Sequence, residues 1–429
     1  MGAIFMYLTW VAQQDNNALV ADFKTYNYFE RILFVCFDLI IYAIKFFIPF
    51  KLAAFHPYPE PISWYYYLTP VIIAAVCFYI FKSNQRRHLL IFGALFYFIN
   101  LILVLQFVSI GNALFAERYT YMPYNGLLFV AGTMLFSDSM KSKQVWAVIL
   151  TIATVFSVIT FQRVKTWKNS ETLWTDQIEK YPDNPHGYYD RGTYYSETGQ
   201  YEKAIVDLDK AVSLKQEYKH FLNRGVAYLK LKNYEKAFDN FSDAYKLDSF
   251  KNEASAGLAQ YYNAKGMNEE AIYYINRSLS QKNTYEGLFT KAAILKGLRR
   301  YDDAVLTYNE AIAMNDNPSA RFNLANIYFS NLNDFNKAVS AYDAVLNLDP
   351  NYPNAAAYKG FALYKANRFS EAITAFNQAL QSDAKNAQVL GYLSMAYQMN
   401  GDISKARQQA ATAESAGFVF DQEFMNKIK

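Results

Sequence analysis

The first part of the chain contains long apolar runs that show no helical stripe. About 20 mainly apolar residues are needed to cross a membrane as a helix, whereas a surface helix of a soluble protein shows an apolar stripe with a period of 3.6 residues. Runs that are apolar on nearly every face cover residues 29–50, 64–81, 88–108, 121–136 and 145–161. We therefore expect residues 1–162 to form an all-α, polytopic bundle of about five full transmembrane helices.

Residues 1–12 are also apolar but are too short to span a membrane. A signal peptide would begin with a charged segment and end at a small-residue cleavage site, and neither is present. We expect this segment to be the end of a spanning helix, and the chain to be the carboxy-terminal part of a longer protein.

The loops between the apolar runs predict how the bundle is oriented. The short loop at 82–88 carries three basic residues, and basic residues in short loops mark the cytoplasmic side. Alternation then places loops 51–63 and 109–120 outside, together with everything after residue 162. Three basic residues follow the last span on that outer side, but long domains are translocated largely regardless of such charges. The sequence predicts a multi-pass membrane protein whose second half is extracytoplasmic, in a periplasm or a lumen.

The second half repeats itself with a period of 33 or 34 residues. Motifs such as YEKAIVDLDKAVSL at 201 and FSEAITAFNQALQS at 369 share one alanine position, which recurs at 204, 237, 271, 304, 338, 372 and 406. A small residue and then a tyrosine or leucine precede each alanine, as in Gly192 and Tyr195. This spacing is typical of the tetratricopeptide repeat, a pair of packed helices. We expect seven repeats at 185–418, a connector with a partial repeat helix at 163–184, and a terminal cap at 419–429.

Stacked helix pairs form a superhelix with a concave surface, and such surfaces bind peptides or segments of proteins. We expect polar residues on the first helix of each pair to face this groove. The candidates are Asp190, Arg191, Asn223, Arg224, Asn323, Asn326 and Lys359. The alternative is that these are ordinary solvated side chains.

Composition excludes several other functions. The formal net charge of +4 belongs to residues 1–182, which hold 14 Lys and Arg against 10 Asp and Glu; the remainder holds 28 of each sign. Because no basic face is clustered, we do not expect a nucleic-acid partner. Cys36 and Cys77 lie in apolar runs without metal-type spacing, and the four histidines are scattered, so we expect no metal site. The sequons at Asn240 and Asn276 matter only in a eukaryotic lumen.

Polar residues at the edges of the apolar runs are candidates for contact with lipid. Glu117 and Arg118 stand just ahead of Tyr119, Tyr121 and a first-turn proline, Pro123. Tyrosines at this position suit the aromatic belt of a membrane interface. Arg118 either faces the headgroup layer as part of this belt or holds the phosphate of a lipid-linked substrate, because a guanidinium matches phosphate oxygens. His56, in the other outer loop, joins these interface candidates.

Asp38 and Lys45 lie inside the first full span. They are seven residues apart, so they share a helix face that must avoid lipid. We expect an intramembrane pair buried between helices, with a catalytic or proton-relay role as the alternative.

Three segments, in this order and followed by repeats, carry a family likeness: FFIPFKLAAFHPYPEP (46–61), AERYTYMPYNGL (116–127) and TWKNSETLWTDQIEKYPDNPHGYYDRG (166–192). They resemble the transmembrane and tetratricopeptide-repeat proteins, whose eukaryotic members are protein O-mannosyltransferases. The resemblance implies a membrane glycosyltransferase that uses a polyprenyl-phosphate sugar donor, with its repeats outside the cytoplasm.

This chain departs from that family at the catalytic loop. In the family an acidic motif lies in the first extracytoplasmic loop, whereas the two outer loops here contain only Glu60 and Glu117. A transferase needs a carboxylate as base or metal ligand. We therefore expect the carboxy-terminal portion of a glycosyltransferase-like protein that lacks its own catalytic centre and cofactor, with repeats that bind a protein partner or acceptor. The alternative is a non-catalytic, membrane-anchored repeat scaffold.

Overall fold

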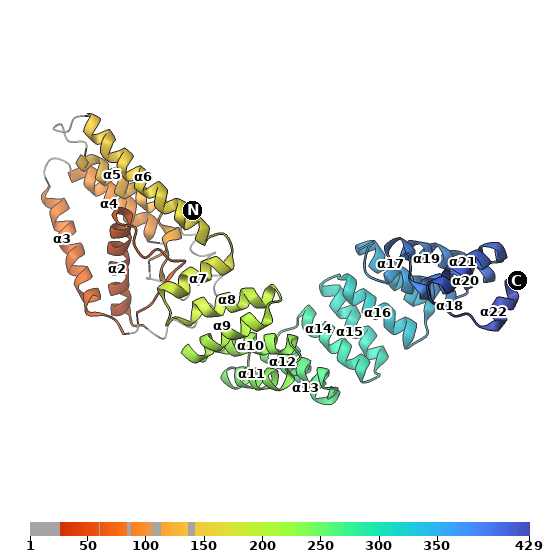
Figure 1. Cartoon of the computed structure of the whole chain (residues 1–429). Helices are drawn as coiled ribbons and strands as arrows, with labels where there is room; N and C mark the ends of the chain where they lie inside the picture. Colours follow the sequence, from red (N-terminus) through yellow and green to blue (C-terminus); the bar gives the residue numbers. More distant parts are fainter. Residues whose placement is uncertain (1–25, 60, 84–86, 103, 106–112, 136–141) are drawn as a thin grey trace. The chain divides into compact units, whose positions relative to one another are not determined.

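The computed structural model describes residues 26–59, 61–83, 87–102, 104–105, 113–135 and 142–429. The chain divides into two compact units, residues 1–216 and residues 217–429. Figure 1 labels the helices of both units.

Among the described residues of the first unit, five α-helices overlap the five predicted apolar windows. They are α2 (Tyr28–Phe47), α3 (Thr69–Lys82), α4 (Arg87–Leu101), α5 (Pro123–Leu135) and α6 (Ser142–Thr166) (Figure 1). Helix α2 starts with a capping box in which the Asn27 side chain accepts from the Glu30 amide and the Glu30 carboxylate accepts from the Asn27 amide. Helix α5 starts at Pro123, where the missing N–H removes no intrahelical bond.

Within the described part of the chain, two helical stretches are long and apolar enough to cross a membrane, Trp64–Lys82 and Trp146–Thr166. The first includes the 3-10 helix η1 (Trp64–Leu68) ahead of α3. Helix α4 is apolar but shorter, and α2 contains four charged residues. The predicted span at residues 1–12 lies outside the described residues. The windows are thus helical, while a five-span bundle stays a prediction.

The connections between these helices form a small structured layer. Strand β1 (His56–Pro57) pairs antiparallel with β2 (Ala113–Phe115), with His56 opposite Phe115, and η2 (Glu117–Tyr119) follows β2. Tyr42 of α2 anchors this layer, because its hydroxyl donates to the Ala116 carbonyl and accepts from the Ala116 amide, both at 3.0 Å.

Helices α4 and α5 approach each other through two glycines. A Cβ atom added to Gly126 would lie 2.6 Å from the carbonyl oxygen of Gly93 and 2.8 Å from the amide nitrogen of Tyr97. Only glycine leaves room for backbones this close, and small residues at such crossings are typical of helices that pack in membranes.

The first unit ends with three helices of the repeat type, α7 (Ser170–Lys180), α8 (Pro185–Glu197) and α9 (Tyr201–Leu214). Helix α8 packs against α7 on one side and α9 on the other. The predicted small residue explains the close contact, because a Cβ at Gly192 would meet the Leu208 side chain at 2.9 Å. Tyr195 and Ala204 are buried in the same pair, as the repeat pattern predicts.

The second unit consists of six further helix pairs and a short last helix (Figure 1). The second helix of each pair begins with the repeat motif and is 13 or 14 residues long. The elements are α10 (Tyr218–Lys230), α11 (Tyr234–Leu247), α12 (Asn252–Ala264), α13 (Asn268–Gln281), α14 (Tyr285–Gly297), α15 (Tyr301–Met314), α16 (Pro318–Ser330), α17 (Phe335–Leu348), α18 (Ala355–Lys365), α19 (Phe369–Ser382), α20 (Ala387–Met399), α21 (Ile403–Ser415) and α22 (Gln422–Lys427).

The segment at α22 covers the last helix pair of this unit. Phe424 and Ile428 are buried against Ala406 and Ala410 of α21, so α22 shields the apolar face that a following repeat would cover. In the α16–α17 turn, Asn333 adopts a positive φ of 53°, and the residue two positions before the second helix also has a positive φ in the other repeats, such as Lys232 and Gly266.

Candidate functional site

Four side chains from separate segments meet in the first unit. Lys45 comes from the end of α2, His56 from β1, Glu117 from η2 and Tyr181 from the residue after α7. We call this set the junction cluster. His56, Glu117 and Tyr181 lie one in each of the three segments that carry the family likeness, and Lys45 directly precedes the first segment.

Glu117 is the centre of the junction cluster. Its Oε1 atom accepts hydrogen bonds from Lys45 Nζ at 2.7 Å and from His56 Nε2 at 2.7 Å. The amide of Ala53 donates to the other carboxylate oxygen at 3.3 Å. The Lys45 side chain is only 2% exposed, so its ammonium group depends on this carboxylate for compensation.

His56 is held through both ring nitrogens. Nε2 lies 2.7 Å from Glu117 Oε1 and 2.9 Å from Lys45 Nζ, and Nδ1 bonds with the Tyr181 hydroxyl. The imidazole also stacks on Phe115, with ring centres 4.0 Å apart, and lies nearly perpendicular to the Tyr181 ring, so these contacts fix its orientation.

Burial and charge set the protonation states of the junction cluster. Burial lowers the pKa of His56, against the opposing effect of its hydrogen bond to Glu117. Burial alone would raise the pKa of Glu117, but the hydrogen bond from His56 and the nearby positive charge lower it to about 2. His56 and Lys45 both contribute to this lowering of the Glu117 pKa. Burial also raises the pKa of Tyr181, which keeps its hydroxyl available as a donor.

Helix α7 holds the loop that carries His56. The side-chain amide of the fully buried Gln177 donates to the Phe55 carbonyl at 3.0 Å, and Lys180 donates to the Leu52 carbonyl. Asp176 in turn accepts from Arg163 near the end of α6 at 2.9 Å. The junction cluster therefore lies where the apolar helices are fastened to the first repeat-type helix.

The other interface candidates lie beside the junction cluster but outside it. Arg118 is exposed, and its guanidinium lies over the Tyr119 ring at 4.9 Å. Tyr121 is 81% exposed. The structure thus leaves Arg118 and Tyr121 open to solvent or lipid, whereas Glu117 and His56 are occupied by each other.

The predicted pair of Asp38 and Lys45 is not formed. Lys45 pairs with Glu117, because the loop after β2 reaches the end of α2 and supplies a closer carboxylate than the one two turns away. Asp38 is fully buried, and neither carboxylate oxygen has a hydrogen-bond partner within the described structure.

Most predicted groove residues are bonded within or between repeat helices. Arg191 forms a two-pronged ion pair with Asp207 of α9, at 2.7 and 2.8 Å. Further bonds hold the other side chains: Arg224 to Asn240, Asn326 to Tyr342, Lys359 to Asp343, and Asn323 to the Ser319 carbonyl. Asp190 and Asn223 also have interaction partners. Arg191, Arg224, Asn326 and Lys359 therefore join two helices, and sequence position alone did not reveal that.

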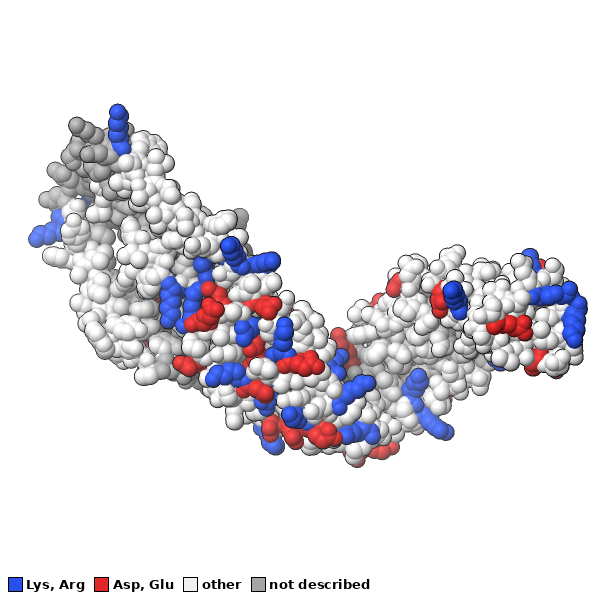
Figure 2. All heavy atoms as spheres, viewed as in Figure 1, with Lys and Arg blue, Asp and Glu red and all other residues white. Residues whose placement is uncertain are grey.

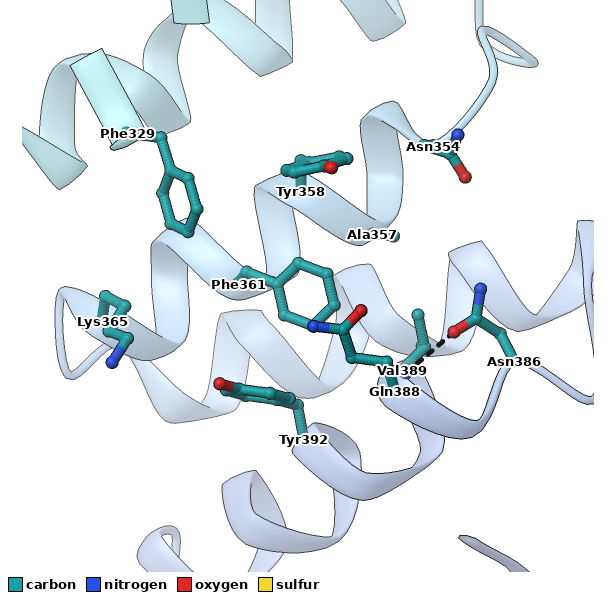
Figure 3. A pocket seen from close by; sticks show the side chains of 10 residues that line it. All are labelled: Phe329, Asn354, Ala357, Tyr358, Phe361, Lys365, Asn386, Gln388, Val389 and Tyr392. Atoms are coloured by element: carbon teal, nitrogen blue, oxygen red, sulfur yellow. Dashed lines mark hydrogen bonds between the residues drawn. The ribbon is translucent and has the colours of Figure 1, made fainter. Parts of the chain in front are cut away.

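The second unit contains a pocket of about 310 Å³ (Figure 3). Its walls come from the first helices of three successive repeats, α16, α18 and α20. It is lined by Phe329, Asn354, Ala357, Tyr358, Phe361, Lys365, Asn386, Gln388, Val389 and Tyr392. We call it the repeat pocket.

The local sequence makes α18 different from its neighbours. Helix α18 has 11 residues, whereas α16 and α20 have 13. Pro350 and Pro353 delay the helix, since a proline disfavours helical structure at the residue before it. The loop ends at Asn354, which has a φ of 63° and whose side chain makes no cap bond. That side chain lies at the rim of the repeat pocket (Figure 3).

Aromatic rings form the wall of the repeat pocket. The ring of Tyr358 meets the Phe329 ring at 6.3 Å and the Phe361 ring at 6.0 Å, and Phe361 meets Tyr392 at 4.9 Å, all nearly edge to face. Sequence reasoning missed these residues, although a signal was present. Asn354 and Gln388 are 34 residues apart, as are Tyr358 and Tyr392. Two successive repeats therefore each present a side-chain amide and, four residues later, a tyrosine. Among the described residues, no group of His, Cys, Asp and Glu could hold a metal ion.

Comparison with protein-family models shows which repeat the second half contains. Three tetratricopeptide-repeat models match residues 177–206, 222–286 and 363–417. The second half of this chain is a tetratricopeptide-repeat array. Within the array, residues 297–379 match the model described as anaphase-promoting complex, cyclosome, subunit 3. All these matches lie within 177–417, so the likeness of the apolar half to the transmembrane and tetratricopeptide-repeat proteins stays a prediction.

Individual proteins resemble the array in part. DnaJ homolog subfamily C member 3 of Gallus gallus is 28% identical over 207 residues, which are 44% of this chain and 40% of that protein. Tetratricopeptide repeat protein 6 of Homo sapiens is 27% identical over 44% of this chain and 37% of its own length. The chain thus spans less than half the length of either relative.

Among solved structures, pilF of Pseudomonas aeruginosa matches 49% of this chain and 97% of its own, with a TM-score of 0.42 and 20% identity. Yeast Tom70 matches 60% of this chain and 56% of its own, with a TM-score of 0.40 and 17% identity.

Proposed function

We propose that this protein is a membrane-anchored repeat scaffold whose tetratricopeptide-repeat array holds a segment of a partner protein. The repeat pocket is the observation that carries the proposal. It combines an aromatic wall with polar groups at its rim, which is the composition of sites that bind a ligand with a defined orientation. It also lies on the first helices of the pairs, whose side chains form the concave face of such arrays.

The exposed apolar helices support the membrane anchor. Large apolar side chains of α3 and α6 are largely exposed, including Val71, Phe78, Leu150 and Phe161. Figure 2 shows few charged side chains on this face of α3 to α6, while charges of both signs are interspersed over the repeats. An apolar surface this extensive requires a lipid or protein environment. Lipid is our proposal, with the array on the extracytoplasmic side.

Photo-crosslinking tests the scaffold. A benzoyl-phenylalanine placed at Gln388, which lines the repeat pocket, should crosslink a partner polypeptide in native membranes. The same group at Thr374, exposed on the second helix α19, is the matched control and should give no such product. Equal crosslinking at both positions, or none at either, would contradict partner binding at the pocket.

A second candidate function is favoured by the convergence at the junction cluster. The three segments that resemble protein O-mannosyltransferases lie far apart in sequence, yet their residues or immediate neighbours bond around Glu117. Arg118, exposed beside them, is available to a polyprenyl-phosphate group. In this alternative the chain is the carboxy-terminal portion of a glycosyltransferase-like protein, and the repeats hold its acceptor.

Lipid labelling separates the two candidates. A photoreactive polyprenyl-phosphate analogue should label the chain in membranes, and Arg118→Ala should reduce labelling at least about 5-fold, since a charge-assisted phosphate contact contributes 1 kcal/mol or more. Arg299→Ala, which removes an exposed arginine of the array, is the control. If both variants label like the wild type, Arg118 does not bind the phosphate and the scaffold function remains.

A further inference from the structure

The polar groups of the repeat pocket are not all used by the fold. The Asn386 side chain caps α20 by accepting from the Val389 amide at 3.1 Å. By contrast, the described structure contains no hydrogen bond from the side chains of Asn354 or Gln388, and no ion pair of Lys365. Figure 3 shows the Gln388 amide beside the Phe361 ring and the Lys365 ammonium at the opposite side of the pocket from Asn354.

The charge at the repeat pocket is of one sign, positive. Lys365 is the only charged residue among those that line it, and no carboxylate is present there. Two nearby cations of the array lie beside acids, since Lys359 lies 2.5 Å from Asp343 and Arg368 lies 2.6 Å from Glu371. A lone cation at the rim of an apolar pocket is complementary to an anionic group on the ligand.

The size and shape of the repeat pocket fit one large side chain. A volume of about 310 Å³ is at the lower limit of pockets that bind whole small molecules, roughly 300 Å³. Tyr358 and Tyr392 are presented by successive repeats, and the ring of Phe361 lies between them in the aromatic wall. Edge-to-face contacts with such rings favour an aromatic side chain as the occupant.

We propose that the repeat pocket binds a segment of a partner protein through an aromatic side chain with a carboxylate close beside it. The aromatic ring packs against the wall formed by Tyr358, Phe361 and Tyr392, and the carboxylate pairs with Lys365. Asn354 and Gln388 each present both a donor and an acceptor, which suits the amides and carbonyls of a peptide backbone. A neutral carbohydrate would leave the Lys365 charge without a partner. This inference rests on the proposed scaffold function.

Peptide selection on the full-length chain in lipid nanodiscs tests the inference. A random 12-residue peptide library should yield sequences with Phe, Tyr or Trp within about three residues of Asp or Glu. In a synthetic peptide of this class, replacing the aromatic residue by Ala should weaken binding by about 10-fold or more, because the apolar surface of the ring is no longer buried against the aromatic wall. Replacing the acid by its amide should weaken binding about 2- to 5-fold, as for a partly exposed ion pair.

Two charge reversals give the matched comparison. Lys365→Glu should remove the preference for an acidic peptide and favour a basic one. Lys230→Glu changes the equivalent lysine of an earlier repeat, at the last turn of α10, which does not line the repeat pocket, and it should behave as the wild type.

The outcomes separate the two proposals. If peptides are selected without an aromatic and acidic pair, or if Lys365→Glu binds them like Lys230→Glu, this inference is wrong while the scaffold function stands. If no peptide is enriched, or if the chain binds glycans in place of peptides, the inference and the proposed scaffold function both fail.

Discussion

At the scale of single residues, Glu117 compensates two buried side chains at once. It accepts from Lys45 and His56 through the same oxygen, and the backbone of Ala53 donates to it as well. A buried cation that loses its only carboxylate is costly, because the desolvation it has already suffered is no longer offset. The junction cluster therefore ties the loop after α2 to the loop after β2 by charge and hydrogen bonding.

The junction cluster predicts a pH dependence. Folding lowers the pKa of His56, so its stabilising effect is complete above about pH 6.5, the ordinary value, and is lost as pH falls through the lowered value. Glu117 adds a second loss from about pH 4.5 down to about 2. Hydrogen exchange of residues 51–59, corrected for the intrinsic rate, should show protection falling below pH 6.5.

His56→Gln provides the control for this prediction. Glutamine can donate to Glu117 but does not titrate, so the loss that begins near pH 6.5 should disappear and the loss at lower pH should remain. A variant with the wild-type pH profile would show that another group causes the change.

At the scale of helices, repetition made the second half predictable. The 34-residue period placed the helix pairs and their buried positions, because every repeat packs against its neighbours in the same way. One helix departs from the regular repeat pattern: α18 is shortened by two prolines, which helps to shape the repeat pocket. The polar contacts between helices were also missed, since a side chain such as Arg191 finds its partner 16 residues away on the next helix.

The crossing of α4 and α5 depends on Gly126. Replacing it with leucine would force a side chain against the Gly93 carbonyl and the Tyr97 backbone. Overpacking of this kind costs about 1–3 kcal/mol, and backbone atoms cannot move aside as a flexible side chain can. We expect Gly126→Leu to lower the melting temperature of the detergent-purified chain, measured by loss of the monodisperse peak after heating. Leu128→Ala, on the exposed side of α5, should leave it nearly unchanged.

At the scale of the whole molecule, the membrane anchor and the location of the array can be tested together. In translation with microsomes, the chain should resist alkaline extraction because α3 and α6 are held in lipid. If the array is translocated, its exposed sequon at Asn276 should acquire a glycan that endoglycosidase H removes, whereas the Asn240 side chain is buried and bonded to Arg224.

The two predicted results can fail independently. Extraction of the chain from the microsomes at alkaline pH would contradict the proposal that α3 and α6 anchor it in the membrane. Retention without a glycan, identical to an Asn276→Gln variant, would place the array on the cytosolic side.

The sequence by itself determined the helices and the repeat family. Apolar runs and a repeated packing pattern are local, and each window carries its own information. Only the tertiary structure decided the partners of polar side chains: Lys45 with Glu117 in place of Asp38, and Tyr358 near Tyr392 around a pocket. Hydrogen bonds and ion pairs act over about 3 Å between residues that can be 60 or more positions apart, and no periodicity in the chain encodes that distance.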